Sequence, residues 1–342
     1  MKDRETQLSE AIAHLPRVQL ASVRPTPLEH LPRLSAHLGG PSIYIKRDDL
    51  TGLAMGGNKT RMFEFALADA LQKGADTIVA GSAVQSNYCR QLSAACAKLG
   101  LELHLVLRPV RPIDKIDQQG NNLLQRLLGA HVTVIDQYDH ASQQEAIQAK
   151  IAEQEALGKT VYWPRQADTI DLDAIAYAES TLEVVQQCRA LDISPSHYYL
   201  CALDTTQAGV GLGLSFLQSD MHLRGICPMA DVPQRCEEMA QIANSGARRL
   251  GLDLQLHSTD FDNDDSFVGE RYGLPTQAGL DALRTLARTE GILLDPVYTS
   301  KAMSALFQHI REGQLDTDRP VVFLHTGGNP ALFAYAADVL DG

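Results

Sequence analysis

The stretch GLAMGGNKTRMFEFALADALQKG, residues 52–74, joins a glycine-rich loop to a segment with helical periodicity. Gly52 and Gly57 have the separation found in the phosphate-binding loop of NTPases. In that loop lysine follows the second glycine directly, whereas here Asn58 stands before Lys59. The preceding residues, KRDDLT, are charged and turn-like, and they do not form the buried strand from which such a loop emerges. We therefore do not interpret this stretch as a nucleotide-binding loop.

The apolar residues after Lys59 recur at helical spacing, which predicts a helix over Arg61–Gly74 with Asn58 close to its cap. A lysine at a helix N-terminus lies at the positive end of the helix dipole, which lowers its pKa and favours the neutral amine. A neutral amine can form a Schiff base with an aldehyde cofactor. The alternative is a solvated surface lysine, so the neighbouring segments have to distinguish the two.

Short β-branched runs and longer helical patterns alternate on both sides of this stretch, which predicts an α/β fold with parallel strands. Strands are expected at residues 42–48, 76–82, 102–109, 131–136, 160–164, 197–203, 223–229 and 319–328. Further helices are expected at residues 87–100, 121–130, 141–158, 179–191, 206–218 and 236–251.

Composition excludes several classes of protein. A formal net charge of -12 over 342 residues argues against non-specific nucleic-acid binding, which needs surplus Lys and Arg. The chain has no long apolar run for a membrane span and no apolar signal core at its polar start. Its six cysteines include no C-x-x-C pair, so we expect free thiols, no metal site and a cytoplasmic protein.

Polar residues gather where strands are expected to give way to helices. Ser86 and Asn87, in GSAVQSNYCRQ, lie at such a junction, where open α/β sheets present ligand-binding groups. The stretch LDTTQAGVG, residues 203–211, combines hydroxyl groups and backbone amides at a helix start, which favours a phosphate. LLDPVYTSKA and FLHTGGNPALFAY add the pair Tyr298 and Thr299 and a Thr-Gly-Gly turn.

Seven blocks occur in order along the chain: TPLEHLPRLSAHLGG, IYIKRDDLTGLAMGGNKTRMFEFALADALQKGADTIV, QSNYCRQ, TTQAG, YGLPT, LDPVYTSKAM and HTGGNPALFAY. On these blocks the chain resembles, over nearly its whole length, the pyridoxal-phosphate enzymes that include D-cysteine desulfhydrase and 1-aminocyclopropane-1-carboxylate (ACC) deaminase. The resemblance implies fold type II, an α/β fold with two open, twisted, mostly parallel sheets flanked by helices. It also implies that a smaller domain, residues 51–165, carries the lysine helix and is inserted in a large cofactor-binding domain, residues 1–50 and 166–342.

The resemblance implies a role for each matching residue. Lys59 is expected to form the Schiff base with pyridoxal 5'-phosphate, and Asn87 to hydrogen-bond the cofactor's 3'-oxygen. The expected catalytic residues are Lys59, Ser86, Tyr272 and Tyr298. The expected cofactor-binding residues are Asn58, Lys59, Asn87, Thr205, Thr206, Gln207, Ala208, Gly209, Thr299 and Thr326, of which residues 205–209 surround the phosphate. The residues expected at the substrate are Gln85, Ser86 and Tyr88.

The implied reaction is β-elimination from a small amino acid, most simply D-cysteine to pyruvate, sulfide and ammonia, in a homodimeric enzyme. The cofactor acts as an electron sink, and Lys59 removes the α-proton. ACC deaminases have Glu after the tyrosine of the PVY motif, and this carboxylate strengthens the withdrawal of electrons by the cofactor ring. This chain has Thr299 at that position, as the desulfhydrases do. We therefore expect ACC deamination to rank below D-cysteine elimination. L-Cysteate sulfo-lyase and hydroxyaspartate dehydratase activities stay open, and a non-enzymatic module that binds an amino acid or the cofactor ranks last.

Some positions depart from the family pattern. Tyr88 stands where His or Gln commonly follows the Ser-Asn pair, close to the substrate. Asp204 stands where the phosphate loop has glycine, so we expect its side chain to turn away from a phosphate, toward a cation. Trp163 and Arg165 replace a glycine-rich segment. They either close over an anionic substrate such as cysteate or, for Arg165, pair only with surface carboxylates.

Other side chains that resemble functional groups also have a structural interpretation. His325 is as readily a hydrogen-bonded core histidine as a catalytic one. Cys89 is expected on the packed side of its helix. Asp262–Asp265 lacks the glycine and the terminal glutamate of a calcium loop, so a solvated loop is expected there.

Overall fold

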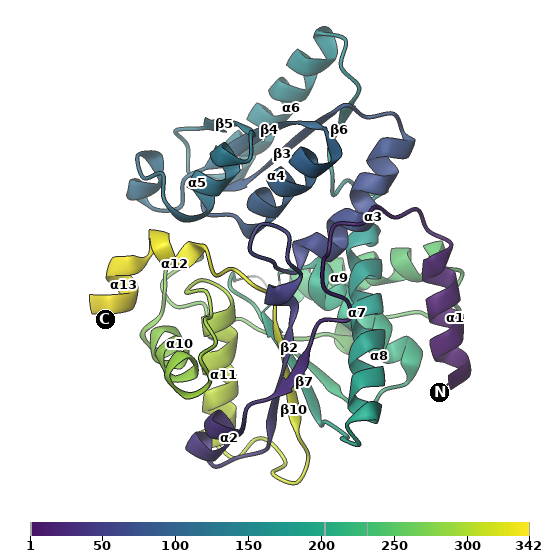
Figure 1. The fold of residues 1–342 in the computed structure, drawn as a ribbon, viewed down its shortest axis with the longest axis vertical. Helices are drawn as coiled ribbons and strands as arrows, with labels where there is room; N and C mark the ends of the chain where they lie inside the picture. Colours follow the sequence, from purple (N-terminus) through teal and green to yellow (C-terminus); the bar gives the residue numbers. More distant parts are fainter. Residues whose placement is uncertain (1, 202, 231, 342) are drawn as a thin grey trace.

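Two sheets, one of six strands and one of four, organise the chain (Figure 1). The computed structural model describes residues 2–201, 203–230 and 232–341. The larger sheet has the order β1-β2-β10-β7-β8-β9, and its neighbouring strands are parallel except for β1 and β2. Its strands are β1 (Leu28–His30), β2 (Ile43–Arg47), β7 (His197–Cys201), β8 (His222–Ile226), β9 (Asp262–Asp264) and β10 (Val321–His325). The smaller, all-parallel sheet has the order β5-β4-β3-β6 and consists of β3 (Thr77–Ala83), β4 (Glu102–Arg108), β5 (His131–Val134) and β6 (Val161–Tyr162).

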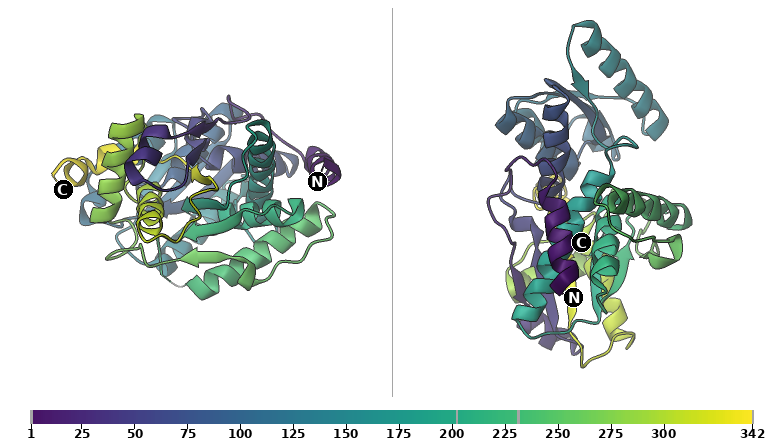
Figure 2. Two further views of the ribbon diagram at one scale, coloured as in Figure 1. Left: turned by 90° about the horizontal axis from the view of Figure 1, so that it is seen from below. Right: turned by 90° about the vertical axis from the view of Figure 1, so that its right-hand side faces the viewer.

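Helices cover both faces of each sheet (Figures 1 and 2). On the larger sheet, α7, α8 and α9 pack on one face and α2, α10 and α11 on the other. On the smaller sheet, α6 packs on one face and α4 on the other. The α-helices described are α1 (Lys2–Ala13), α2 (Pro32–Leu38), α3 (Lys59–Gln72), α4 (Asn87–Leu99), α5 (Gly120–Leu127), α6 (His140–Ala156), α7 (Asp171–Ala190), α8 (Thr205–Leu217), α9 (Val232–Arg249), α10 (Gln277–Glu290), α11 (Thr299–Arg311), α12 (Ala331–Ala334) and α13 (Ala336–Asp341). Short 3-10 helices are η1 (Asp48–Leu50), η2 (Pro112–Lys115) and η3 (Ser258–Asp260).

The predicted α/β fold with two mostly parallel sheets is confirmed, and some details differ. The expected solvated loop at residues 262–265 is wrong, because residues 262–264 form the edge strand β9. Arg224 on the neighbouring strand binds the carboxylates of Asp262 at 2.6 Å and Asp264 at 3.2 Å, which offsets their mutual repulsion. Helix α7 begins eight residues before the expected start at residue 179, and α10 and α11 were not predicted.

Helix α3 packs into a hydrophobic core on the larger sheet and into another on the smaller sheet. Met62 and Phe65 pack in the core that α7 and α8 form on the larger sheet. Phe63 and Leu67 point the other way, into the core between α4 and the smaller sheet. The helix is therefore buried around most of its circumference, which explains why its apolar residues extend beyond one face.

A buried ion network fixes the first turn of α3. Arg61, which is fully buried, binds Asp48 at 3.0 Å and Glu183 of α7 at 2.7 Å. Lys46 of β2 binds the same Glu183 carboxylate at 2.9 Å. Burial disfavours every one of these charges, so they persist because each has an opposite charge and hydrogen-bond partners. The network holds α3, and with it Lys59, against the larger sheet.

All four strands of the smaller sheet lie between residues 77 and 162, and all six strands of the larger sheet lie outside that range. The proposed domain bounds at residues 51 and 165 stay a prediction. Among the described residues, no helix is both long enough and apolar enough to cross a membrane.

Candidate functional site

A cavity lies where four helices, α3, α4, α8 and α11, begin. The ends of β3 and β7 reach it, as expected for the carboxyl edges of parallel sheets. Helix N-termini carry partial positive charge and unpaired N–H groups, so four of them together favour an anionic ligand. The lining residues are Asn58, Lys59, Ser82, Ser86, Asn87, Tyr88, Arg165, Cys201, Leu203, Asp204, Thr206, Tyr272, Tyr298 and Thr326.

Lys59 presents its amine to this cavity from the first residue of α3. Burial, and after it the positive charge of Arg165, lower the pKa of Lys59 to about 8. Within the described part of the chain, no hydrogen bond or ion pair involves its ammonium group. The predicted direction of the pKa shift therefore holds, although burial rather than the helix dipole is the main cause. An amine of this kind is available as a nucleophile or base near neutral pH.

Close backbone packing fixes the loop that leads to Lys59. Gly57 has φ 128°, a conformation that side chains disfavour. Gly327 packs so closely against it that an added Cβ would lie 2.7 Å from the Gly57 Cα. The backbone N–H of Asn58 donates to the Thr326 carbonyl at 3.0 Å. The side-chain NH₂ group of Asn58 donates to the Thr206 hydroxyl at 3.0 Å. The glycine turns at residues 57 and 327 thus place the lysine beside the start of α8.

Asn87 is held in one orientation at the start of α4. Its side-chain oxygen accepts hydrogen bonds from Arg90 at 3.0 Å and from Asn121 at 2.9 Å. This leaves the Asn87 NH₂ group as the free donor of that side chain. Ser86 caps the same helix by accepting a hydrogen bond from the Cys89 amide at 3.2 Å. The Ser86 hydroxyl keeps its own hydrogen for a ligand.

Tyr272 and Tyr298 meet hydroxyl to hydroxyl at the cavity wall, although they are 26 positions apart in the chain. Burial raises the pKa of Tyr272, and burial together with the neighbouring Tyr272 raises the pKa of Tyr298 well above the ordinary value. Both phenols therefore stay protonated at neutral pH. They can donate hydrogen bonds or a proton.

Arg165 faces the same cavity and is not a surface ion pair. Its guanidinium binds Asp173 at 2.8 Å and Asp204 at 3.5 Å, donates to the Thr205 hydroxyl at 2.9 Å, and lies 4.8 Å from the Tyr88 ring centre. Asp204 thus has the expected cation partner, yet it still lines the cavity and caps α8 through the Thr205 amide at 2.5 Å. Burial opposes the ionisation of Asp204, but the charges of Arg165 and Lys59 outweigh it and lower the pKa of its carboxyl.

The cavity brings together nine predicted residues: Asn58, Lys59, Ser86, Asn87, Tyr88, Thr206, Tyr272, Tyr298 and Thr326. Other predicted residues lie behind the wall. Gln85 accepts from the Asn121 amide at 2.9 Å, and Gln207 donates to the Asp262 carbonyl at 2.9 Å. Ala208 and Gly209 face α7, where a Cβ on Gly209 would lie 2.2 Å from the Ala174 carbonyl oxygen. The Thr205 and Thr299 hydroxyls are directed toward Arg165 and Asp295 respectively.

Three further cavity residues, Ser82, Cys201 and Leu203, were not among the predicted site residues. Their position at or just after the ends of β3 and β7 was the available signal. Trp163 does not line the cavity; it packs beside Val79 and Ile147, so its expected closure over a substrate is wrong.

Cys89 is buried as predicted, and the contacts of His325 favour the structural one of the two roles that the sequence left open. Cys89 is fully buried, and burial raises the pKa of its thiol to about 12. His325 binds the Leu293 carbonyl oxygen at 2.8 Å and accepts from the Gly327 amide at 3.3 Å.

Comparisons with known proteins agree on one family. The model of the family described as "Pyridoxal-phosphate dependent enzyme" matches residues 20–327. D-cysteine desulfhydrases of Salmonella typhi and of Salmonella newport (strain SL254) are each 40% identical over 329 residues, which is 95% of this chain and 97% of theirs. The crystal structure of an ACC deaminase homologue is 31% identical, with a TM-score of 0.88 and 98% of both chains covered. The threonine deaminase of T.th. shares the fold at 19% identity and a TM-score of 0.64, covering 96% of this chain and 97% of that one.

Proposed function

We propose, from the premise that the chain belongs to the pyridoxal-phosphate dependent enzymes, that it is a lyase that removes the β-substituent of a small amino acid. D-Cysteine is the preferred substrate, and it reacts with water to give pyruvate, hydrogen sulfide and ammonia. The similarity to D-cysteine desulfhydrases along 95% of the chain supports this choice. The observation that carries the proposal is the Lys59 amine, which has a lowered pKa and faces a cavity lined by hydroxyl and amide groups.

The residues of the cavity fit pyridoxal phosphate. Lys59 supplies the amine for its aldehyde, and the free NH₂ group of Asn87 supplies a donor for an oxygen on its ring. Thr206 and the start of α8 supply donors for its phosphate. Asp204 opposes the phosphate charge, and Arg165 beside it offsets that repulsion. When bound, the cofactor supplies an electron-withdrawing ring that accepts the electron pair left by the α-proton.

The side chains of the protein bind the substrate and move protons. Lys59, with a pKa of about 8, takes the α-proton as general base. Ser86 orients the substrate carboxylate through its free hydroxyl hydrogen. Tyr298, protonated and in contact with Tyr272, gives a proton to the departing sulfur, which leaves as hydrogen sulfide. Each role needs only groups that already line the cavity.

A second candidate substrate class has an anionic β-substituent, as in L-cysteate or hydroxyaspartate. Arg165 supports it, because this guanidinium lies in the cavity wall next to Tyr88, at the position expected for the substrate. Asp173 and Asp204 already neutralise Arg165, so an anionic substrate would have to compete with them. For that reason we rank this class second.

ACC ranks below both classes. Thr299, the residue expected opposite the pyridine nitrogen, gives its hydroxyl hydrogen to Asp295 at 2.7 Å and accepts from the Asp295 amide at 2.8 Å. A hydroxyl engaged in this way does not keep a ring nitrogen protonated, whereas a carboxylate would stabilise the protonated nitrogen by accepting its hydrogen bond. A cofactor ring whose nitrogen is not protonated withdraws electrons less strongly, and this suits a substrate with a good leaving group. A module that binds ligands without turnover ranks last, since Lys59, Ser86 and Tyr298 are all in place.

Product analysis distinguishes the candidates. The purified enzyme with its cofactor is given D-cysteine, L-cysteine, L-cysteate, hydroxyaspartate and ACC separately, with Lys59→Ala as the inactive control. We expect pyruvate and sulfide from D-cysteine. Sulfite from cysteate, or oxaloacetate from hydroxyaspartate, would transfer the assignment to the anionic class, and 2-oxobutyrate would contradict the argument from Thr299. Absence of any keto acid despite bound cofactor would leave only the binding module.

We also propose a homodimer located in the cytoplasm. Support for the dimer comes from exposed apolar side chains on adjoining segments: Ile116 after η2 (77% exposed), Leu127 of α5 (75%) and Phe333 of α12 (62%). Six buried free thiols fit a reducing compartment. Light scattering of the purified protein tests the dimer, because a monomer mass would exclude it.

A further inference from the structure

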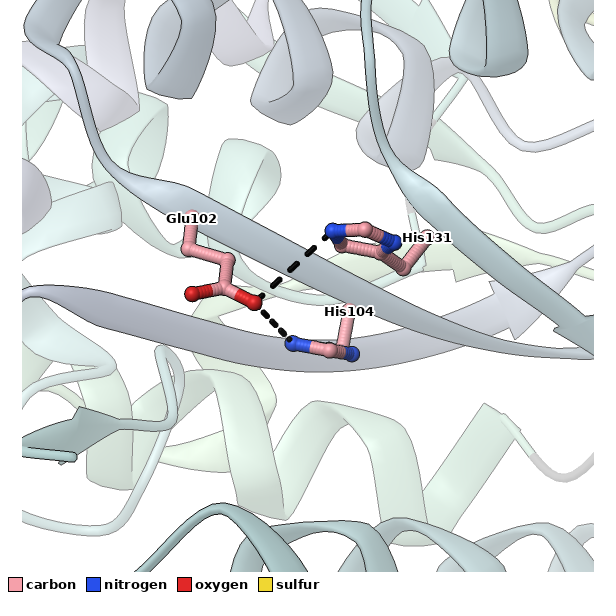
Figure 3. A group of neighbouring side chains, drawn as sticks. All are labelled: Glu102, His104 and His131. Atoms are coloured by element: carbon pink, nitrogen blue, oxygen red, sulfur yellow. Dashed lines mark hydrogen bonds and ion pairs between the residues drawn. The ribbon is translucent and has the colours of Figure 1, made fainter. Parts of the chain in front are cut away.

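Three metal-ligating side chains converge on the smaller sheet, on the face covered by α6 (Figure 3). Glu102 and His104 are two residues apart on β4 and therefore point to the same face. His131, the first residue of β5, is paired in register with His104. The parallel pairing of β4 and β5 thus brings the three side chains together.

Their donor atoms have separations close to those of a metal site. His104 Nε2 lies 2.9 Å and His131 Nε2 lies 3.7 Å from the same Glu102 oxygen, and all three donor atoms lie within 4.8 Å of one another. Zinc bonds of about 2.0–2.2 Å at tetrahedral angles place donors about 3.4 Å apart. Side-chain rotations that move each donor atom by less than about 1 Å would bring the three donors to that spacing.

Hydrogen bonding does not account for the whole arrangement. The His104 ring has Glu102 as its partner, but the distance of 3.7 Å from His131 to the same oxygen is too long for a hydrogen bond. The His131 ring stacks on His104 with centres 4.7 Å apart and planes 19° apart, and both Nε2 atoms face the carboxylate (Figure 3).

Nearby lysines leave the inner carboxylate oxygen accessible. Lys159 binds the other oxygen of Glu102 at 2.7 Å, and Lys150 is engaged by Glu153 at 2.7 Å. The charge of Lys159 weakens the attraction of Glu102 for a cation without blocking the oxygen that faces the histidines. His131 is 63% exposed, so an ion and its water ligands can enter from solvent.

We propose that Glu102, His104 and His131 bind one divalent transition-metal ion of the zinc class. Two imidazole nitrogens and one carboxylate oxygen suit zinc, cobalt or nickel better than magnesium or calcium, which prefer oxygen ligands. The ion links β5, an edge strand, to β4 and stabilises that edge of the smaller sheet. Glu102 and His131 begin their strands, whereas the cavity with Lys59 lies at the opposite, carboxyl ends. The ion therefore stabilises the sheet and takes no part in turnover.

Zinc titration of the chelator-treated holoenzyme tests the proposal by calorimetry. We expect one equivalent bound by the native protein and an affinity at least about tenfold lower in His131→Ala. His140→Ala, which removes another exposed histidine at the start of α6, is the matched control and retains the native affinity. Zinc held by the cofactor itself would persist in His131→Ala, so the difference between the two variants isolates this site.

Two further measurements distinguish a specific zinc site from non-specific binding at the surface. Zinc should raise the melting temperature of the native protein and of His140→Ala, but not of His131→Ala or of Glu102→Gln. Turnover of His131→Ala should equal that of the native enzyme. Equal zinc affinity in the native protein and His131→Ala, or no binding by the native protein, would overturn the assignment.

Discussion

Arg165→Gln is the sharpest test of how the cavity sets the reactivity of Lys59. In the native protein burial, followed by the charge of Arg165, lowers the pKa of Lys59 to about 8. At pH 7 about 9% of Lys59 is then the neutral amine, against about 0.04% for an ordinary lysine of pKa about 10.4. The shift means that the cavity destabilises the ammonium form by about 3 kcal/mol relative to the neutral amine.

Removing the Arg165 charge raises the pKa of Lys59 toward the ordinary value. Asp173 and Asp204 keep their negative charges and lose their partner, which adds to the same change. Burial remains, so the pKa stays below that of a solvated lysine. The neutral fraction at pH 7 therefore falls in the variant, while the fraction at high pH does not change.

The pH profile of amine modification measures this shift. Cofactor-free protein is reductively methylated with formaldehyde and cyanoborohydride between pH 6 and pH 11, and the Lys59 peptide is quantified by mass spectrometry. Lys98, exposed on α4, is followed in the same digest, so that the ratio of the two removes the pH dependence of the reagents. Arg311→Gln, a change at an exposed arginine of α11, is the charge-matched control. A native midpoint equal to that of Lys98, or an unmoved midpoint in Arg165→Gln, would refute the reasoning.

Four further substitutions or reactions have defined outcomes. Asp48→Asn removes a fully buried carboxylate and should lower the free energy of unfolding by about 3–5 kcal/mol in urea titrations, whereas the exposed Asp136→Asn should change it by less than about 0.5 kcal/mol. Gly209→Ala should lower it by about 1–3 kcal/mol, since the new methyl group meets the backbone of α7; an unchanged urea midpoint would contradict this packing. Tyr298→Phe should reduce the turnover number about 10²–10³-fold with little change in bound cofactor, and full activity would exclude its role as proton donor. The Cys89 thiol, with a pKa of about 12, should resist thiol reagents in the folded protein at pH 8 and react only after denaturation; rapid labelling of the native protein would show that it is accessible.

Local patterns predicted the elements that carry the cavity well. The helix from Lys59 was found because its apolar periodicity and the asparagine before it agree, and the structure begins it within two residues of the prediction. Helix α11 was not predicted, although Ala302, Met303, Leu306 and Ile310 follow a helical period. The sequence therefore carries the signal for this helix as well.

Other features depend on contacts that no local pattern contains. The meeting of Tyr272 with Tyr298 joins the residues before α10 to the start of α11. The position of Arg165 in the cavity wall depends on two carboxylates, Asp173 and Asp204, from the beginnings of α7 and α8. These pairs follow from how the helices pack on the sheet, which propensity and periodicity do not encode.

Strand β10 is synthesised after every other described strand, and this order limits when the surroundings of Lys59 can form. The smaller sheet needs only residues up to 162, whereas β10, residues 321–325, is the strand that joins β2 to β7 in the larger sheet. The Thr326 carbonyl that follows β10 also holds the Asn58 amide, next to Lys59. A nascent chain on the ribosome can therefore pair the strands of the smaller sheet early. The surroundings of Lys59 cannot be completed until residues 321–326 have been added, so the cofactor can be captured only after β10 has been synthesised and paired.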